Sequence, residues 1–354
     1  MCEIIRDYWP TKEWRICSPK DVDMDWNILR EADTYIEKNM PNVNSFVLVR
    51  NGYIVFEKYY NGRCKDILNP VMSVTKSVIS LLIGIAIHQE FIESVDQKVV
   101  QYFPELIIDA TNYMSFELTI RHLLTMTSGI QWRTASRGRE YMLDRMCRSK
   151  NWAEFILGLP VQKNTFGKFQ YNSGNSHLLS AIITTATGLN AQSFLNKYIL
   201  NILGIKEIYS SSLGYAGFNG IDSVFERMGE EQWVKDPQGH NMGGLGLSLS
   251  TRDMAKIGYL YLNNGFWEKQ FLVSDSWVSD SFKAYNGGDY GYHWWIKCFK
   301  GYNAYCAIGF GGQYIIVVPQ YDIVVVVTSD VNQAAVNSKD PISILDKYII
   351  KSIQ

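Results

Sequence analysis

The 354-residue sequence predicts an α/β fold with an all-α part: an antiparallel sheet flanked by helices, with a helical region inserted in the chain. Three observations support this fold class. A hairpin pattern lies near the N-terminus, two β-prone runs lie near the C-terminus, and helical patterns fill most of the sequence between them. We therefore expect a discontinuous α/β sheet domain of residues 1–100 and 285–354, and a mainly helical domain of residues 101–284.

The N-terminal strands are predicted by SFVLVRNGYIVFEKYYNG, residues 45–62. Two β-branched and aromatic runs flank Asn51-Gly52, a strong signal for a two-residue hairpin turn. At the other end of the chain, Tyr314–Val318 and Ile323–Thr328 form two further β-prone runs, joined by a turn that contains proline. The simplest arrangement pairs these runs with the hairpin in one sheet, with a closing helix in SILDKYIIKSI, residues 343–353.

The middle of the chain alternates apolar helical stretches with glycines. Gly129, Gly158, Gly188 and Gly204 follow such stretches, so we expect each glycine to end a helix. The stretch STRDMAKIGYLYLNNG, residues 250–265, opens with a Ser/Thr cap and also ends on glycine.

Composition excludes several classes of function. A net charge of -1 and 47% hydrophobic residues are typical of a globular protein and give no indication of a nucleic-acid or anionic-membrane partner. The N-terminus shows no apolar signal region, and the longest apolar run, Val78–Ile87, is too short to span a bilayer. We therefore expect a cytoplasmic protein. The oligomeric state cannot be inferred from the sequence.

The six cysteines and five histidines show no metal-ligand spacing, because C-x-x-C and H-E-x-x-H are both absent from the sequence. We therefore expect reduced thiols, no metal and no cofactor.

The stretch NPVMSVTKSVISLLIGIAIHQEF places Ser73 and Lys76 one helical turn apart. Two interpretations are open. Ser73 caps a helix and Lys76 is a solvated side chain, or the two form an activated nucleophile. The helix that follows is apolar nearly all round and so predicted to be buried, where an ammonium is costly unless paired or deprotonated. Residues i and i+3 share a helix face, and the first turn offers backbone N–H groups to an oxyanion.

Five blocks in order carry a wider resemblance. They are MSVTKSVISLLIGIAI, TIRHLLTMTSGIQW, FQYNSGNSHLLSAII, GGLGLSLSTRDMAKIGYLYLNNGFW and GFGGQYIIVVPQYDIVVVV. The chain resembles the serine hydrolases of the class C β-lactamase superfamily, which includes DD-peptidases, family VIII esterases and nylon-oligomer (aminohexanoate-dimer) hydrolases. The resemblance implies a β-lactamase/DD-peptidase-like fold with the active site between the sheet and the helical region. The G-x-S-x-G motif does not occur in the sequence, so the other common serine-hydrolase arrangement, the nucleophile elbow, is excluded.

The resemblance assigns roles to the first two motifs. Ser73 would be the nucleophile that forms an acyl-enzyme, and Lys76 would keep its proton mobile. Tyr171-Asn172-Ser173 would be the second motif, in a loop before a helix beginning near Ser176. Tyr171 would act with Lys76 as a coupled proton-transfer pair, and Ser173 would hydrogen-bond the lysine or the substrate. The bare Tyr-x-[Asn/Ser] pattern also matches at Tyr59, Tyr113, Tyr209 and Tyr261.

The third motif departs from the family pattern. Where β-lactamases have Lys-Thr-Gly, this chain has Ala307-Ile308-Gly309 in AIGFGGQ. The lost side chains help to hold a β-lactam carboxylate, so the change favours a neutral acyl substrate. Gly309 would keep the strand edge clear, and the backbone N–H of Phe310 would be the second oxyanion donor. Gly311 and Gly312 belong to the site or form only a bulge or turn.

Other conspicuous residues lie near these motifs. In YGYHWWIK, Trp294 and Trp295 face opposite sides if the segment is extended, so one would line the acyl pocket and the other the core. His293 is expected to be structural. Tyr141, Met142 and Met146 either shape substrate entry or fill space.

Three functions follow in order of preference. The first is a serine hydrolase of small esters or amides, acting on a small molecule without a nucleic-acid or membrane partner. The second is a true β-lactamase or DD-peptidase, against which the absence of an export signal argues. The third is a non-hydrolytic binding or sensor protein on the same scaffold, which would not need Ser73, Lys76 and Tyr171 together.

Overall fold

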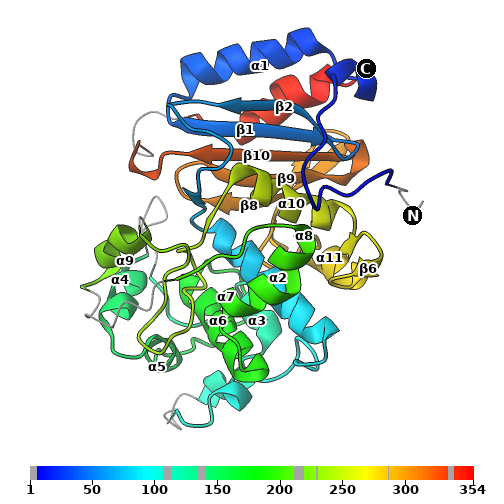
Figure 1. Cartoon of the computed structure of the whole chain (residues 1–354). Helices are drawn as coiled ribbons and strands as arrows, with labels where there is room; N and C mark the ends of the chain where they lie inside the picture. Colours follow the sequence, from blue (N-terminus) through cyan, green and yellow to red (C-terminus); the bar gives the residue numbers. More distant parts are fainter. Residues whose placement is uncertain are drawn as a thin grey trace.

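The computed structural model describes residues 6–106, 113–133, 140–210, 219–228, 230–285, 287–333 and 339–354. At its centre lies a six-stranded antiparallel sheet with the strand order β2-β1-β10-β9-β8-β7 (Figure 1). The strands are β1 (Val43–Arg50), β2 (Tyr53–Tyr59), β7 (Trp295–Phe299), β8 (Tyr302–Gly309), β9 (Gln313–Val318) and β10 (Ile323–Ser329).

The sheet joins the two ends of the chain. Strand β1 pairs with β10 in a register that sets Val47 opposite Val326. The predicted hairpin is confirmed: Asn51 and Gly52 have φ angles of 52° and 87°, as a type I′ turn requires. The discontinuous sheet is thus present, while the domain boundaries at residues 100 and 285 stay a prediction.

Helices cover both faces of the sheet. Helix α1 (Trp26–Asn39) and the C-terminal helical turns, which begin with α12 (Ile342–Ile344), pack on one face, while α2 (Val74–His88) and α10 (Thr251–Leu262) pack on the other (Figure 1). Neighbouring residues Val47 and Leu48 belong to the two opposite apolar clusters. Because both faces are buried, the central strands are apolar throughout instead of alternating.

The remaining helices gather around α2, on the side of the molecule away from α1 (Figure 1). Within the described residues they are α3 (Ile120–Leu124), α4 (Tyr141–Arg148), α5 (Trp152–Leu157), α6 (Ser173–Thr187), α7 (Ala191–Leu195), α8 (Asn201–Leu203), α9 (Ile221–Met228) and α11 (Asp275–Ser281). The short strand pairs are β3 (Asn69–Pro70) with β4 (Ser248–Leu249), and β5 (Phe266–Trp267) with β6 (Gln270–Phe271). None of the described helices combines the length and apolar character needed to cross a bilayer.

Two helix predictions are corrected. The helix expected to end at Gly129 is only α3 and stops after Leu124. Gly129 instead lies where the chain pairs with a neighbouring segment, and a side-chain Cβ there would lie 2.8 Å from the Phe166 Cα. Helix α6 begins at Ser173 instead of near Ser176, because the Asn172 side chain caps its first turn.

Candidate active site

Ser73 lies at the N-terminal end of buried helix α2, on a turn with unusual backbone geometry. The preceding residue, Met72, has a φ angle of 51°, which costs a residue other than glycine about 1 kcal/mol. Ser73 occupies the N-cap position, but its side chain makes no capping hydrogen bond. Its hydroxyl is therefore not used to cap the helix, and the residue is partly exposed.

Lys76 is buried and directed at Ser73. Only 1% of the residue is exposed, which excludes the solvated side chain that the sequence left open. Its Nζ lies 3.0 Å from Ser73 Oγ and donates a 2.6 Å hydrogen bond to the Gly244 carbonyl oxygen. The amine and the hydroxyl are thus already within hydrogen-bonding reach.

Tyr171 completes the group. Lys76 Nζ lies 4.9 Å from the centre of the Tyr171 ring. The ring stacks on Trp295 with 6.0 Å between centroids and 21° between planes. Tyr171 stands just before helix α6, and Ser73 at the start of α2, so the ends of two helices bring together residues nearly a hundred positions apart in sequence.

Ser173 hydrogen-bonds Glu140 and not Lys76, the first of its two predicted partners, while a contact with the substrate stays a prediction. Its Oγ donates to Glu140 Oε1 at 2.6 Å and its N–H donates to Glu140 Oε2 at 2.8 Å, while the hydrogen bonds of Lys76 go to Ser73 and Gly244. Glu140 also accepts from Trp132 Nε1 at 2.5 Å. The carboxylate sits at the N-terminus of α6, where backbone N–H groups favour negative charge. Ser173 therefore anchors the Tyr171 loop through Glu140.

Strand β8 ends against the turn that carries Ser73. A Cβ on Gly309 would lie 2.3 Å from the Val71 carbonyl oxygen and 3.1 Å from Met72 Cβ, so only glycine permits this approach. Among the described residues, neither the Ser73 N–H nor the Phe310 N–H donates a backbone hydrogen bond. Both donors are therefore available to a bound oxygen atom.

The two glycines after Phe310 form the turn between β8 and β9. Gly311 and Gly312 have φ angles of 85° and 99° in this turn, while a place of Gly311 in the site stays a prediction. Phe310 itself is 58% exposed at this turn, beside the site.

Aromatic rings cluster around Tyr171 and Trp295. Trp295 contacts Tyr171, Phe169 and Tyr290. Its neighbour Trp294 is fully buried and packs on other core rings, so the two side chains differ as expected, while a role of Trp295 in an acyl pocket stays a prediction. Burial raises the pKa of Tyr290 well above its ordinary value, with further raising by Tyr171 and Glu140.

His293 links helices α2 and α6 through hydrogen bonds. Its carbonyl accepts from Ser77 Oγ at 2.6 Å on α2, and its Nε2 lies 2.9 Å from Ser176 Oγ on α6. Burial and, to a smaller extent, the charge of Lys76 lower the pKa of His293 to about 3. The imidazole is therefore neutral, in agreement with the expected structural role.

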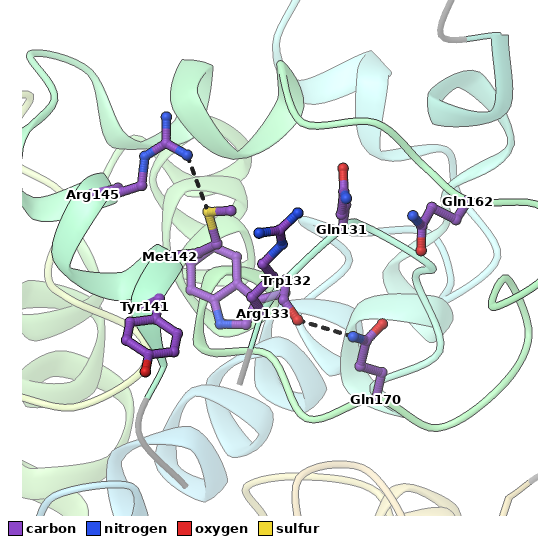
Figure 2. Close-up of a pocket in the computed structure, with 8 residues that line it drawn as sticks. All are labelled: Gln131, Trp132, Arg133, Tyr141, Met142, Arg145, Gln162 and Gln170. Atoms are coloured by element: carbon purple, nitrogen blue, oxygen red, sulfur yellow. Dashed lines mark hydrogen bonds between the residues drawn. The ribbon is translucent and has the colours of Figure 1, made fainter. Parts of the chain in front are cut away.

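A pocket of about 590 Å³ lies beside the second motif (Figure 2). Tyr141 and Met142 line it, whereas Met146 is buried. Trp132 also lines this pocket, and Trp132 shares Glu140 with Ser173. Within the described ranges, no group of three or more His, Cys, Asp and Glu side chains is arranged to hold a metal ion.

Sequence reasoning missed several residues of this site. Glu140 carries no recognisable spacing, since it stands alone after a basic stretch. Gly244 lies inside one of the five blocks, and a Cβ added to it would lie 2.8 Å from Ser173 Cβ. No sequence signal indicates that its carbonyl accepts a hydrogen bond from Lys76. Phe169 and Tyr290 read as ordinary core aromatics.

Comparison with known proteins agrees with this architecture. The Beta-lactamase family profile matches residues 34–348. The chain is 24% identical over 307 residues to 6-aminohexanoate-dimer hydrolase of Paenarthrobacter ureafaciens, covering 80% of this chain and 71% of that protein. A solved structure of a candidate 6-aminohexanoate-dimer hydrolase from Bacillus anthracis has a TM-score of 0.68 at 21% identity, over 90% of this chain and 80% of that one. The solved structure of a class C β-lactamase from Rhodobacter sphaeroides has a TM-score of 0.61 at 17% identity, and the match covers 92% of this chain and 98% of that one.

These findings define the class of protein as a hydrolase with the β-lactamase fold. The chain belongs to the Beta-lactamase family. The predicted superfamily and the predicted sheet with flanking helices are thereby confirmed.

Proposed function

We propose that the chain hydrolyses a small ester or linear amide through an acyl-enzyme on Ser73, with Lys76 and Tyr171 as the proton-transfer pair. One observation carries this proposal: the 3.0 Å contact between Lys76 Nζ and Ser73 Oγ at the start of a buried helix. A lysine side chain that is 1% exposed and directed at a partly exposed hydroxyl fits an activated nucleophile.

The reaction proceeds in two halves. Ser73 Oγ attacks the carbonyl carbon while its proton passes to the Lys76–Tyr171 pair, and the backbone N–H groups of Ser73 and Phe310 stabilise the oxyanion. Collapse of the tetrahedral intermediate expels the alcohol or amine, which takes up that proton. Water then attacks the acyl carbon and loses a proton to the same pair. The second tetrahedral intermediate breaks its bond to Ser73 Oγ, which takes that proton back as the acid is released.

The substrate we propose is a linear amide or ester of the 6-aminohexanoate type. The name of the Paenarthrobacter relative supports this class. By the resemblance Ala307 takes the place of the lysine of β-lactamases, so this position offers no cation to a β-lactam carboxylate. Trp295, partly exposed and stacked on Tyr171, provides an apolar surface for a methylene chain.

True β-lactamase or DD-peptidase activity is the second candidate, favoured only by the shared fold of the class C enzyme. The absence of the lysine and threonine in the third motif argues against it. The two candidates differ in their substrates and can be separated directly.

Fluorophosphonate labelling followed by intact-mass spectrometry tests the nucleophile. We expect one adduct on the wild type and none on Ser73→Ala, which should lose turnover but keep its fold. A panel of p-nitrophenyl esters, 6-aminohexanoate dimer and nitrocefin then tests the substrate class. Ester and amide turnover without nitrocefin turnover supports the first proposal, comparable nitrocefin turnover selects the second, and undiminished hydrolysis by Ser73→Ala removes Ser73 from the mechanism.

A further inference from the structure

The pocket beside the second motif has a composition suited to an anion. Figure 2 shows three glutamines grouped at one end and Arg145 at the other. The residues that matter for its chemistry are Gln131, Trp132, Arg133, Arg145, Gln162 and Gln170. Two guanidinium groups and three amides around one cavity of about 590 Å³ offer many donors and a net positive charge.

Neither arginine is neutralised within the described part of the chain. No ion pair there involves Arg133 or Arg145, and the Arg145 guanidinium reaches only the Met142 sulfur, at 3.9 Å, and the Phe155 ring. The neighbouring Glu140 accepts its hydrogen bonds from Trp132 and Ser173. Such a pocket attracts a carboxylate, which guanidinium binds through two parallel hydrogen bonds.

The pocket and the reacting centre are separated by one stretch of backbone. Gln170 lines the pocket and donates to the Trp132 carbonyl at 2.9 Å, while the next residue, Tyr171, contacts Lys76. The Trp132 ring also packs against Gly174 at the start of α6, where an added Cβ would lie 2.7 Å away. Tyr171 therefore lies next in sequence to a residue of the pocket wall and in contact with Lys76, the neighbour of Ser73.

We propose that Arg133 and Arg145 bind the terminal carboxylate of a linear substrate whose scissile carbonyl lies at Ser73. This proposal rests on the proposed function and narrows the substrate to amides or esters that carry a free carboxylate on an aliphatic chain. The methylenes pack on Tyr141 and Met142, which line the pocket, and the glutamine amides complete the hydrogen bonding. Charge recognition thus lies on the α4 side of the site, while the β8 side, with Ala307, is neutral.

Steady-state kinetics on a matched pair of substrates tests the proposal. The pair is 6-aminohexanoate dimer and the same molecule with its carboxylate converted to a carboxamide. We expect wild-type kcat/KM to favour the carboxylate by about tenfold or more. The double variant Arg133→Gln, Arg145→Gln should remove this preference, mainly through KM. Arg148→Gln, on the same helix but paired with Asp144, is the control and should keep it. Equal use of both substrates by the wild type, or an intact preference in the double variant, would overturn the proposal.

A binding measurement separates this proposal from the catalytic one. Calorimetric titration of the Ser73→Ala variant with N-acetyl-6-aminohexanoate needs no turnover. Binding that disappears when both arginines are replaced supports the pocket even if p-nitrophenyl acetate is not hydrolysed, in which case only the catalytic proposal fails. If p-nitrophenyl acetate is hydrolysed but N-acetyl-6-aminohexanoate does not bind, only the proposed carboxylate site is overturned. Tighter binding of inorganic phosphate than of the carboxylate also overturns it, because the site would then be a general anion site.

Discussion

The buried lysine beside Ser73 is held by a backbone carbonyl. Gly244 accepts a hydrogen from Lys76 Nζ at 2.6 Å, and this bond is possible whether the nitrogen carries two hydrogens or three. Lys76 can therefore exchange a proton with Ser73 without losing its anchor. The Tyr171 ring lies 4.9 Å from Lys76 Nζ, and in the proposed mechanism it is the second proton carrier.

Lys76→Met and Tyr171→Phe test the proton-transfer pair. Each change keeps most of the side-chain volume but removes the titrating group, so acylation should slow by about 10²-fold or more. Stopped-flow measurement of the p-nitrophenol burst reports this step. Lys163→Met, at an exposed site, is the control and should retain the wild-type burst. Wild-type acylation by both site variants would contradict the assignment.

Glu140→Ala tests whether the carboxylate anchors the second motif. The change leaves the Ser173 N–H, the Ser173 hydroxyl and Trp132 Nε1 without their acceptor, at about 1–3 kcal/mol for each donor left unsatisfied. We expect a lower melting temperature together with a lower kcat, because the Tyr171 loop loses its position. The exposed Glu154→Ala is the matched control. If Glu140→Ala kept both properties of the wild type, the anchoring role would be wrong.

Contacts between secondary-structure elements depend on glycines with no room for a side chain. Gly309 brings the end of β8 against the turn that leads into α2, and Phe310 is the next residue along the chain. The proposed oxyanion donor at position 310 would therefore depend on how two elements pack and not on the side chain of that residue.

Gly309→Ala should push β8 away from Val71 and so reduce kcat by about 10²-fold, the usual cost of losing one oxyanion donor. It should also lower the free energy of unfolding, because the new methyl group has no space. Gly288→Ala, whose nearest neighbour would lie at an ordinary 3.4 Å, should change neither property. Kinetics and guanidinium unfolding on both variants provide the measurement, and a fully active Gly309→Ala would refute the geometry.

The elements that the sequence predicted well are those with local signals. Asn51-Gly52 determines its own turn, and the apolar run after Ser73 determines its helix, so the hairpin, α2 and the Ser73–Lys76 spacing could be read directly. Gly129 was assigned wrongly because its conformation serves contact with Phe166, far along the chain. Glu140 and Gly244 could not be predicted, because their contacts exist only once distant segments have packed.

At the scale of the whole molecule, the buried neutral side chain of His293 makes the free energy of unfolding depend on pH. His293 joins α2 to α6, and Lys76 and Tyr290 face it. Its pKa is lowered from 6.5 to about 3 by burial, so between these values the unfolded chain binds a proton that the folded chain does not. Stability is therefore fully present above about pH 6.5 and is lost as the pH falls, by about 1.4 kcal/mol per pH unit at most for one proton.

His293→Asn removes this titrating group and suits the backbone, since asparagine tolerates the observed φ of 60°. We expect the loss of unfolding free energy between pH 7 and pH 5 to be smaller in the variant than in the wild type. Denaturant unfolding at the two pH values gives the comparison, and His88→Asn, at an exposed position, should behave like the wild type. Burial also lowers the pKa of His122 and His240, so part of the acid sensitivity should persist. Identical pH dependence in His293→Asn and the wild type would exclude the linkage.

The pairing of β1 with β10 has a consequence for synthesis on the ribosome. The ribosome translates Ser73, Lys76 and Tyr171 well before strands β8 and β10. Strand β8 leads into the turn with Phe310, and β10 is the partner of β1 in the centre of the sheet. A nascent chain that has just passed Tyr171 thus holds the proposed nucleophile but not the proposed second oxyanion donor. Hydrolytic activity should therefore begin only when nearly the whole chain has emerged, and truncated translation products should be inactive.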